Sequence, residues 1–184
     1  MKPQGKPTES AVLIAVPEAE DVVDRFRVHL DRSAAWGVPP HVTVLYPFVP
    51  PDRINQLVLD RLAEAVGSVP AFDVTLARLS WFGHNVLWLA PEPEHPFRAL
   101  TTAVWERFPD HPPYRGAHAD LVPHLPIGAD ASLERLQRAA IAIRPLLPIR
   151  SHVAAARLMQ GSPDAGTWHT IAALPLAAAT DCGR

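Results

Sequence analysis

Residues 40–48 read PHVTVLYPF, and the interpretation of the whole chain starts from this stretch. In an extended strand, successive side chains point to opposite faces. The predicted strand therefore carries His41, Thr43 and Leu45 on one face and Val42, Val44 and Tyr46 on the other. An imidazole and a hydroxyl group thus lie two residues apart on one surface.

A partial echo of this stretch occurs at residues 123–128, PHLPIG. A proline again precedes a histidine, which is followed by an apolar, a variable and an apolar residue. None of the other seven histidines has Ser or Thr two residues further on, so the pattern at His41 does not simply reflect a histidine-rich chain.

The elements around the two histidines repeat in the same order. Hydrophobic periodicity predicts strands at 11–16, 72–82, 86–90, 150–159 and 167–176, and helices at 18–33, 51–66, 95–108 and 132–147. Residues 83–85 form a hairpin turn, and the proline-rich segment 109–122 is a loop. The unit strand, helix, histidine strand, helix, strand therefore covers residues 12–80 and again 86–158. A duplicated unit predicts two lobes related by a pseudo-twofold axis, with His41 and His124 facing one another across a central cleft.

Composition limits the classes of function. Of 184 residues, 48% are hydrophobic and 20% are charged, as in a globular protein. We expect a single domain at 11–176 with flexible segments at 1–10 and 177–184. The formal charge of −2 argues against binding along extended nucleic acid, so a nucleic-acid substrate would be held at one end. A single cysteine, Cys182, excludes an internal disulfide or a multi-cysteine zinc site.

The N-terminal region lacks a long apolar segment. The run at 11–16 is too short for a signal peptide or a membrane span, so we expect a cytoplasmic protein, without membrane contact and monomeric.

Two facing histidines suit the cleavage of a phosphodiester. One imidazole takes a proton from the attacking water or hydroxyl while the other gives a proton to the departing oxygen. Thr43 is placed to donate a hydrogen bond to a non-bridging phosphate oxygen. This chemistry needs no metal and no other cofactor.

The pair Pro-His41-Val-Thr43-Val and Pro-His124-Leu-Pro-Ile, with the duplicated element order, resembles the 2H phosphoesterase superfamily. The similar group within it is the bacterial 2′-5′ RNA ligase or cyclic phosphodiesterase family, and the resemblance covers residues 11–176. It implies an α+β fold of two lobes of mainly antiparallel sheet flanked by helices, with one His-x-Thr/Ser motif from each lobe in the cleft. It also implies a hydrolase that opens 2′,3′-cyclic phosphates at nucleotide or RNA ends, with 2′-5′ joining of RNA ends in some members. By this likeness His41, Thr43 and His124 are the catalytic residues.

Pro126 departs from the family pattern, because it occupies the position of the second Thr or Ser. Proline has neither a hydroxyl nor an N–H, so a phosphate donor is lost there. We expect a replacement donor from the long loop or the C-terminal part of the chain. The predicted substrate-binding residues are Pro126, Tyr114, Arg115, His118, Trp168 and His169, and Ser162 is a further donor candidate.

Two alternatives remain at this point. If the loss at Pro126 cannot be compensated, the chain is a catalytically impaired module that binds nucleotides or RNA ends. Alternatively, His111, His118, Asp120 and His124 suggest a metal-dependent hydrolase, although their spacing matches no recognised zinc pattern.

Overall fold

The computed structural model describes residues 6–117, 120–129, 131–164 and 166–178. Its strands are β1 (Glu9–Ala15), β2 (His41–Leu45), β3 (Phe72–Phe82), β4 (Val86–Glu92), β5 (Leu125–Ala129), β6 (Ile149–Val153), β7 (Ala155–Gly161) and β8 (His169–Pro175). Its α-helices are α1 (Glu20–Leu30), α2 (Arg32–Trp36), α3 (Gln56–Val66), α4 (His95–Arg107) and α5 (Leu133–Ile143). Short 3-10 helices are η1 (Pro17–Ala19), η2 (Pro51–Arg53), η3 (Pro113–Gly116) and η4 (Arg144–Leu146).

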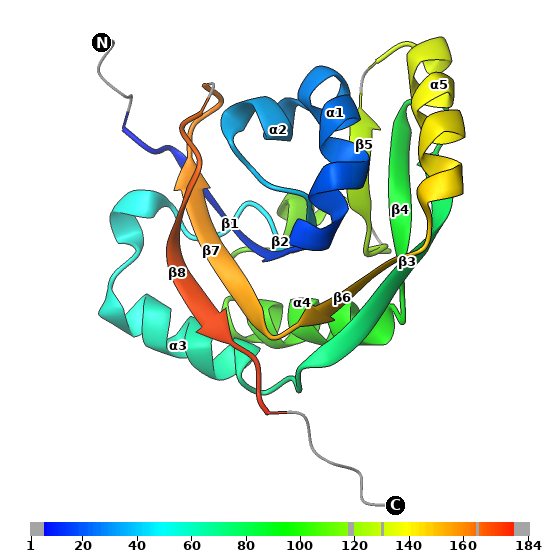
Figure 1. The fold of residues 1–184 in the computed structure, drawn as a ribbon. Helices are drawn as coiled ribbons and strands as arrows, with labels where there is room; N and C mark the ends of the chain where they lie inside the picture. The colour runs from blue at the N-terminus through cyan, green and yellow to red at the C-terminus, as the bar shows by residue number, and fades with distance from the viewer. Residues whose placement is uncertain (1–5, 118–119, 130, 165, 179–184) are drawn as a thin grey trace, which may run out of the picture.

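The strands form two four-stranded antiparallel sheets, in the orders β2-β1-β7-β8 and β5-β4-β3-β6 (Figure 1). The predicted α+β fold of two mainly antiparallel sheets flanked by helices is therefore confirmed. Each histidine strand is an edge strand, and the two edges, β2 and β5, contact each other. Proline is tolerated at sheet edges and at bulges. Pro126 satisfies both conditions, because β5 is an edge strand and its register with β4 shifts between Leu87 and Trp88.

One helix from each half of the chain packs against the histidine strand of the other half. α1 contacts β5 and α5, whereas its counterpart α4 contacts β2 and α3. A continuous core joins them, with Leu30 of α1, Val44 of β2, Leu100 of α4 and Ile127 of β5 all buried. Each histidine strand is thus held in place by a helix from the other half. Among the described residues, no helix combines the length and apolar character that crossing a membrane requires.

The strands of the predicted repeat are distributed differently from our expectation. β3 does not return to the sheet of β1 and β2 but pairs with β4 and β6 in the second sheet. The tight turn at 83–85 explains this, since the two strands of a hairpin must be neighbours. The strand predicted at 150–159 is in fact two strands, β6 and β7, which separate at Ala154 and join different sheets.

A register shift changes which side chains face the cleft in the first sheet. Ala15 pairs with His41 and Leu13 with Thr43, but Val12 pairs with Leu45, which leaves one extra residue in β2. Leu45 is therefore buried in the main core. The prediction that Leu45 shares the face of His41 and Thr43 is wrong, because a bulge interrupts the alternation.

The same bulge reverses Tyr46. Its ring lies with Leu13, Trp36 and Trp168 in a second apolar cluster, and its hydroxyl donates to Glu9 Oε2 at 2.8 Å. The prediction that Tyr46 shares a face with Val42 and Val44 is therefore wrong as well, since those two residues belong to the main core.

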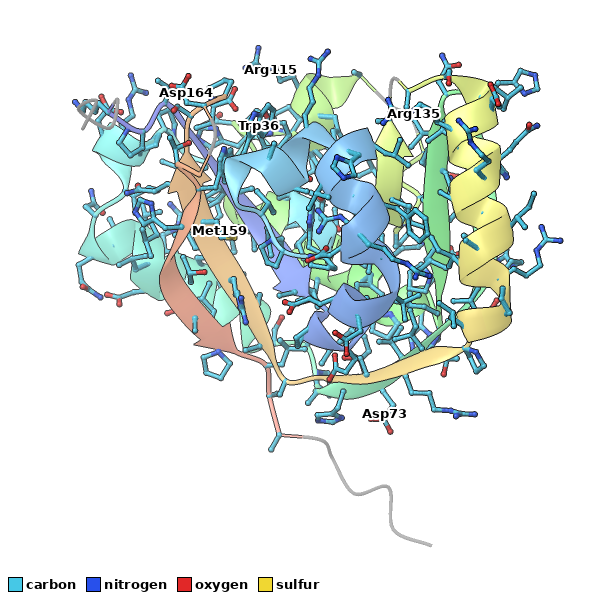
Figure 2. The ribbon with its side chains drawn as sticks, turned by 45° about the horizontal axis from the view of Figure 1, so that its top comes forward. Trp36, Asp73, Arg115, Arg135, Met159 and Asp164 are labelled. Carbon is cyan, nitrogen blue, oxygen red and sulfur yellow. The ribbon has the colours of Figure 1, made fainter. Side chains whose placement is uncertain are left out.

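The second apolar cluster includes residues of β1 and β7 in the first sheet. The Trp36 and Trp168 rings are stacked, with their centroids 6.5 Å apart. The Trp168 N–H donates to the Trp36 carbonyl at 2.9 Å. Figure 2 shows Trp36 close to the β7–β8 hairpin that carries Asp164. β1 begins at Glu9, two residues before the predicted domain boundary, while the segments 1–5 and 179–184, with Cys182, lie outside the described residues.

Candidate active site

The two histidines have the same local geometry. His41 is the first residue of β2, and His124 immediately precedes β5. His41 Nδ1 lies 2.8 Å from the Pro39 carbonyl oxygen, and His124 Nδ1 lies 2.8 Å from the Val122 carbonyl oxygen. A carbonyl can only accept, so Nδ1 carries the proton in both neutral rings. In each ring Nε2 is therefore the nitrogen that accepts and releases a proton.

The two imidazoles act on each other electrostatically. β2 contacts β5, and a charge on His124 is among the influences that disfavour a charge on His41. Burial is the main cause that lowers the pKa of His41 from 6.5 to about 4, and the Arg27 cation lowers it further. The hydrogen bond to Pro39 and the negative charge of Asp31 act in the opposite direction. His41 is consequently a neutral base at neutral pH.

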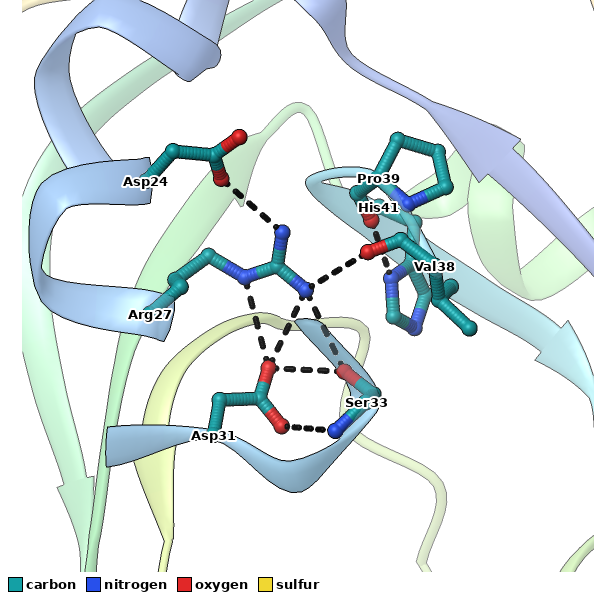
Figure 3. A network of polar contacts seen from close by, with 7 residues as sticks. All are labelled: Asp24, Arg27, Asp31, Ser33, Val38, Pro39 and His41. Atoms are coloured by element: carbon teal, nitrogen blue, oxygen red, sulfur yellow. Dashed lines mark hydrogen bonds and ion pairs between the residues drawn. The ribbon is translucent and has the colours of Figure 1, made fainter. Parts of the chain in front are cut away.

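A buried arginine fixes the backbone that leads into β2 (Figure 3). Arg27 is 1% exposed, and its guanidinium donates to Asp24 Oδ1 at 3.1 Å and to Asp31 Oδ2 at 3.1 Å. It also donates to the Val38 carbonyl oxygen at 3.3 Å, one residue before the carbonyl that orients His41. Asp31 in turn accepts from the Ser33 N–H at 2.9 Å at the start of α2. Arg27 thus ties α1, α2 and the approach to His41 into one unit.

Tyr114 joins the long loop to the first histidine motif. The Thr43 hydroxyl and the Tyr114 phenol are hydrogen-bonded, and burial, the larger influence, raises the pKa of that phenol. The Tyr114 N–H donates to the Tyr46 carbonyl at 2.6 Å. Tyr114 and Arg115 both have left-handed backbone conformations, with φ of 49° and 56°. Such conformations cost about 1–3 kcal/mol per residue and tend to occur where a site requires them. Here they accompany a phenol held against Thr43.

A cavity of about 570 Å³ adjoins His124. Tyr114, His124 and Pro126 line it, together with Phe82 from β3. Pro126 pairs in register with Trp88 of β4, so both lie on the face that carries His124. The structure therefore brings together five of the predicted site residues: His41, Thr43, Tyr114, His124 and Pro126.

The other predicted residues lie elsewhere. Arg115 lines a separate cavity of about 430 Å³ with Glu9 and His111. Trp168 is 7% exposed, and its indole N–H donates to the Ser162 carbonyl at 3.1 Å. His169 is exposed at the start of β8, and His118 lies outside the described residues.

The candidate metal ligands that the structure describes, His111, Asp120 and His124, form no metal-binding group, and the fourth, His118, lies outside the described residues. Within residues 6–117, 120–129, 131–164 and 166–178, no three His, Cys, Asp or Glu side chains form a group that could hold a metal ion. His111 packs against the Phe48 ring, and Asp120 accepts from Arg98 at 3.0 Å.

Two residues of the site were missed by sequence reasoning, Arg27 and Phe82. Arg27 falls between Val23 and Leu30 on the buried stripe of α1, at helical spacing, and this position was the available signal. The sequence carried no comparable signal for Phe82, because its place beside His124 depends on the pairing of β4 with β5.

Comparisons with known proteins identify the family and the fold. The family model described as the 2′-5′ RNA ligase superfamily matches residues 15–165. Escherichia coli LigT, in a structure complexed with 3′-AMP, is similar with a TM-score of 0.60 and 18% identity, covering 93% of this chain and 99% of that one. TT0787 of Thermus thermophilus is similar with a TM-score of 0.63 and 14% identity, covering 92% and 98%. At these identities the structures support the fold alone. A search of curated proteins finds no significant match.

Proposed function

We propose, because the chain belongs to the 2′-5′ RNA ligase superfamily, that it is a metal-independent phosphodiesterase that opens a 2′,3′-cyclic phosphate on a nucleotide or an RNA end. Family membership supports an activity of the phosphoesterase or ligase type. The observation that supports this particular reaction, the opening of a 2′,3′-cyclic phosphate, is the matched pair of histidines. Each donates Nδ1–H to the carbonyl two residues before it. His41 begins β2 and His124 immediately precedes β5, and these two edge strands contact each other.

In this mechanism His41 is the general base and His124 the general acid. Neutral His41 takes a proton from water through Nε2 as the water oxygen forms a bond to phosphorus. The bond from phosphorus to one ribose oxygen breaks, and protonated His124 gives its Nε2 proton to that oxygen. General acid–base catalysis of this kind contributes about 100-fold to 10,000-fold in rate. With a 5′-hydroxyl in place of water, the same steps join two RNA ends.

Thr43 and Tyr114 stabilise the phosphate in this proposal. Both side chains carry a hydroxyl and are already adjacent, since Thr43 is hydrogen-bonded to the Tyr114 phenol. Burial raises the pKa of Tyr114, so its phenol keeps its proton as a donor. We therefore assign to Tyr114 the hydrogen bond that the family pattern gives to the residue at position 126. A neutral hydroxyl can turn toward a phosphate oxygen as negative charge builds there.

The substrate is a nucleotide or a short RNA end, in keeping with the net charge of −2. A structure of E. coli LigT complexed with 3′-AMP exists, and another is complexed with NADP+. These structures show that proteins with this fold bind nucleotides.

Hydrolysis of 2′,3′-cyclic nucleotides in excess chelator tests the proposal. The parent should turn over, and His41→Ala and His124→Ala should each lose at least about 100-fold in kcat. His152→Ala is the matched control, because His152 is an exposed histidine on β6 that pairs with Asp73 at 2.7 Å. Loss of activity in chelator would instead support a metal-dependent hydrolase.

Pro126 favours a second candidate function, a module that binds nucleotides without efficient turnover. This function would be established if the parent protein bound the product nucleotides tightly but hydrolysed none of the 2′,3′-cyclic nucleotides.

A further inference from the structure

The cavity beside His124 has the composition of a subsite for a flat apolar group. Six of its lining residues are apolar: Phe82, Val86, Leu121, Val122, Pro126 and Ala129. Its volume of about 570 Å³ lies within the range of about 300–1,000 Å³ that is usual for small-molecule pockets.

The polar side chains that line the cavity already have partners. Asp120 accepts from Arg98 at 3.0 Å, Tyr114 is hydrogen-bonded to Thr43, and His124 Nδ1 is bonded to the Val122 carbonyl. In the proposed function the Tyr114 hydroxyl and His124 Nε2 serve the phosphate and the departing oxygen, so a bound ring would meet mainly the apolar lining.

Phe82 offers an aromatic surface within the cavity. It is 36% exposed, whereas Trp88 beneath it is 6% exposed. The two rings are stacked, with their centroids 4.7 Å apart and their planes 28° apart. The His124 ring meets the Phe82 ring edge-on at 5.0 Å and 85°. The Phe82 ring is thus held in place by Trp88 and contacts His124, the proposed general acid.

The direction of the proposed reaction decides which part of the substrate lies here. The acid protonates the departing ribose oxygen, so the ribose and its base lie on the side of His124, and the attacking water lies on the side of His41. We infer that the cavity lined by Phe82, Val122 and Pro126 is a nucleobase subsite, in which the base stacks on Phe82 without selection for base identity. This inference rests on the proposed function for the orientation of the substrate.

Calorimetric titration of nucleoside 3′-monophosphates tests the subsite without turnover. Phe82→Leu keeps an apolar side chain but removes the π-face, and base stacking on an aromatic ring is worth about 1–3 kcal/mol. We expect the Kd of all four nucleotides to rise about five-fold or more, by similar factors. Phe72→Leu is the matched control, because Phe72 lies at the other end of β3, where its ring packs edge-on against Phe97. Melting curves of both variants establish that they are folded.

A base-free probe, methyl ribofuranoside 3-phosphate, completes the experiment. We expect the parent to bind it more weakly than any of the nucleotides. An unchanged Kd for all four nucleotides in Phe82→Leu would overturn the subsite, as would equal affinity of the parent for the base-free probe. If Phe82→Leu raised the Kd of only one nucleotide, the inference that the subsite does not select among bases would be wrong. Hydrolysis of the base-free 2′,3′-cyclic phosphate by the parent tests the proposed function separately, so the two can fail independently.

Discussion

At the scale of single residues, the site depends on how one buried histidine is kept neutral. His41 is 7% exposed, and burial together with the Arg27 cation lowers its pKa to about 4, against the opposing effects of the Pro39 carbonyl and Asp31. Arg27 has two effects: its charge acts on His41, and its hydrogen bond to Val38 fixes the adjoining backbone.

Replacement of Arg27 separates these two effects. In the parent, kcat/KM should rise as the pH passes about 4, because the base form of His41 is required. Arg27→Met removes the cation, so the pKa of His41 rises toward its ordinary value of about 6.5 and the acid limb moves to higher pH. Arg27→Lys keeps the charge and should leave the limb close to that of the parent. A limb that stays near pH 4 in Arg27→Met would show that the cation does not set the protonation of His41.

The same histidine predicts how stability depends on pH. The pKa of His41 is lower in the folded state, at about 4, than in the unfolded chain, at about 6.5. Between these values the unfolded chain binds the extra proton, so this contribution to the free energy of unfolding is complete above pH 6.5 and is lost as the pH falls to 4. The gap corresponds to about 3 kcal/mol. Urea denaturation at pH 7 and pH 4.5 should show a smaller acid loss in His41→Gln than in the parent. Equal losses would contradict the prediction.

Pro126 and Tyr114 form a pair that can be tested together. If Tyr114 supplies the second phosphate donor, Tyr114→Phe should lower kcat by about 100-fold or more, since that is the usual effect of losing one oxyanion donor. Pro126→Thr should have little effect in the parent but should recover part of the loss in Tyr114→Phe. A large gain in the Pro126→Thr single variant would mean that the parent site is impaired.

At the scale of the elements, two helices reach the second histidine motif because one glycine lets them approach. A Cβ at Gly128 would lie 2.7 Å from Leu136 Cδ2 of α5 and 2.8 Å from Leu30 Cβ of α1. Only glycine, which has no Cβ, therefore fits at position 128. α1 also carries Arg27, so this contact links the network around His41 to the strand that follows His124.

Gly128→Ala should therefore destabilise the protein by about 1–3 kcal/mol, as overpacking of a core usually does. Thermal or urea unfolding measures the loss. Leu136→Ala removes one of the two clashing side chains, so the double variant should be more stable than the sum of the single effects predicts. Simple additivity would indicate that the clash is relieved by movement of the backbone.

Sequence reasoning was most successful where a pattern was local. The helices, the hairpin at 83–85 and the equivalence of His41 and His124 depend on neighbouring residues, and the structure contains them. The single helix predicted at 18–33 is the exception, because extended backbone at Asp31 ends α1 and the Asp31 side chain caps α2. The pairing of β3 with β6 and the break at Ala154 depend on contacts between distant strands, which periodicity does not encode. The bulge in β2 was likewise not predictable from periodicity. Its one extra residue moves Tyr46 to the opposite face of the strand. Within the site, Arg27 was recoverable from its place on the helix, whereas Phe82 required the sheet.

At the scale of the whole molecule, charge distinguishes a protein that binds an RNA end from one that binds along a strand. The formal charge of −2 gives the molecule no net attraction for a polyanion, and the proposed site engages one phosphate with hydroxyl and imidazole groups. We therefore expect KM for oligonucleotides ending in a 2′,3′-cyclic phosphate to stay nearly constant as their length increases beyond two nucleotides.

Salt provides the quantitative form of this expectation. For single strands, log K falls with log[salt] by about 0.7 for each phosphate neutralised, so contact with one or two phosphates predicts a slope between about −0.7 and −1.4. Binding of a non-cleavable RNA end to the parent, measured over a range of salt concentrations, gives this slope directly. A steeper slope that grows with RNA length would mean that arginines outside the cleft, such as Arg135 and Arg138 on α5, contact the backbone. A shallow slope at every length would mean that recognition ends with the terminal nucleotide, which the proposed subsite lined by His124 and Phe82 accommodates.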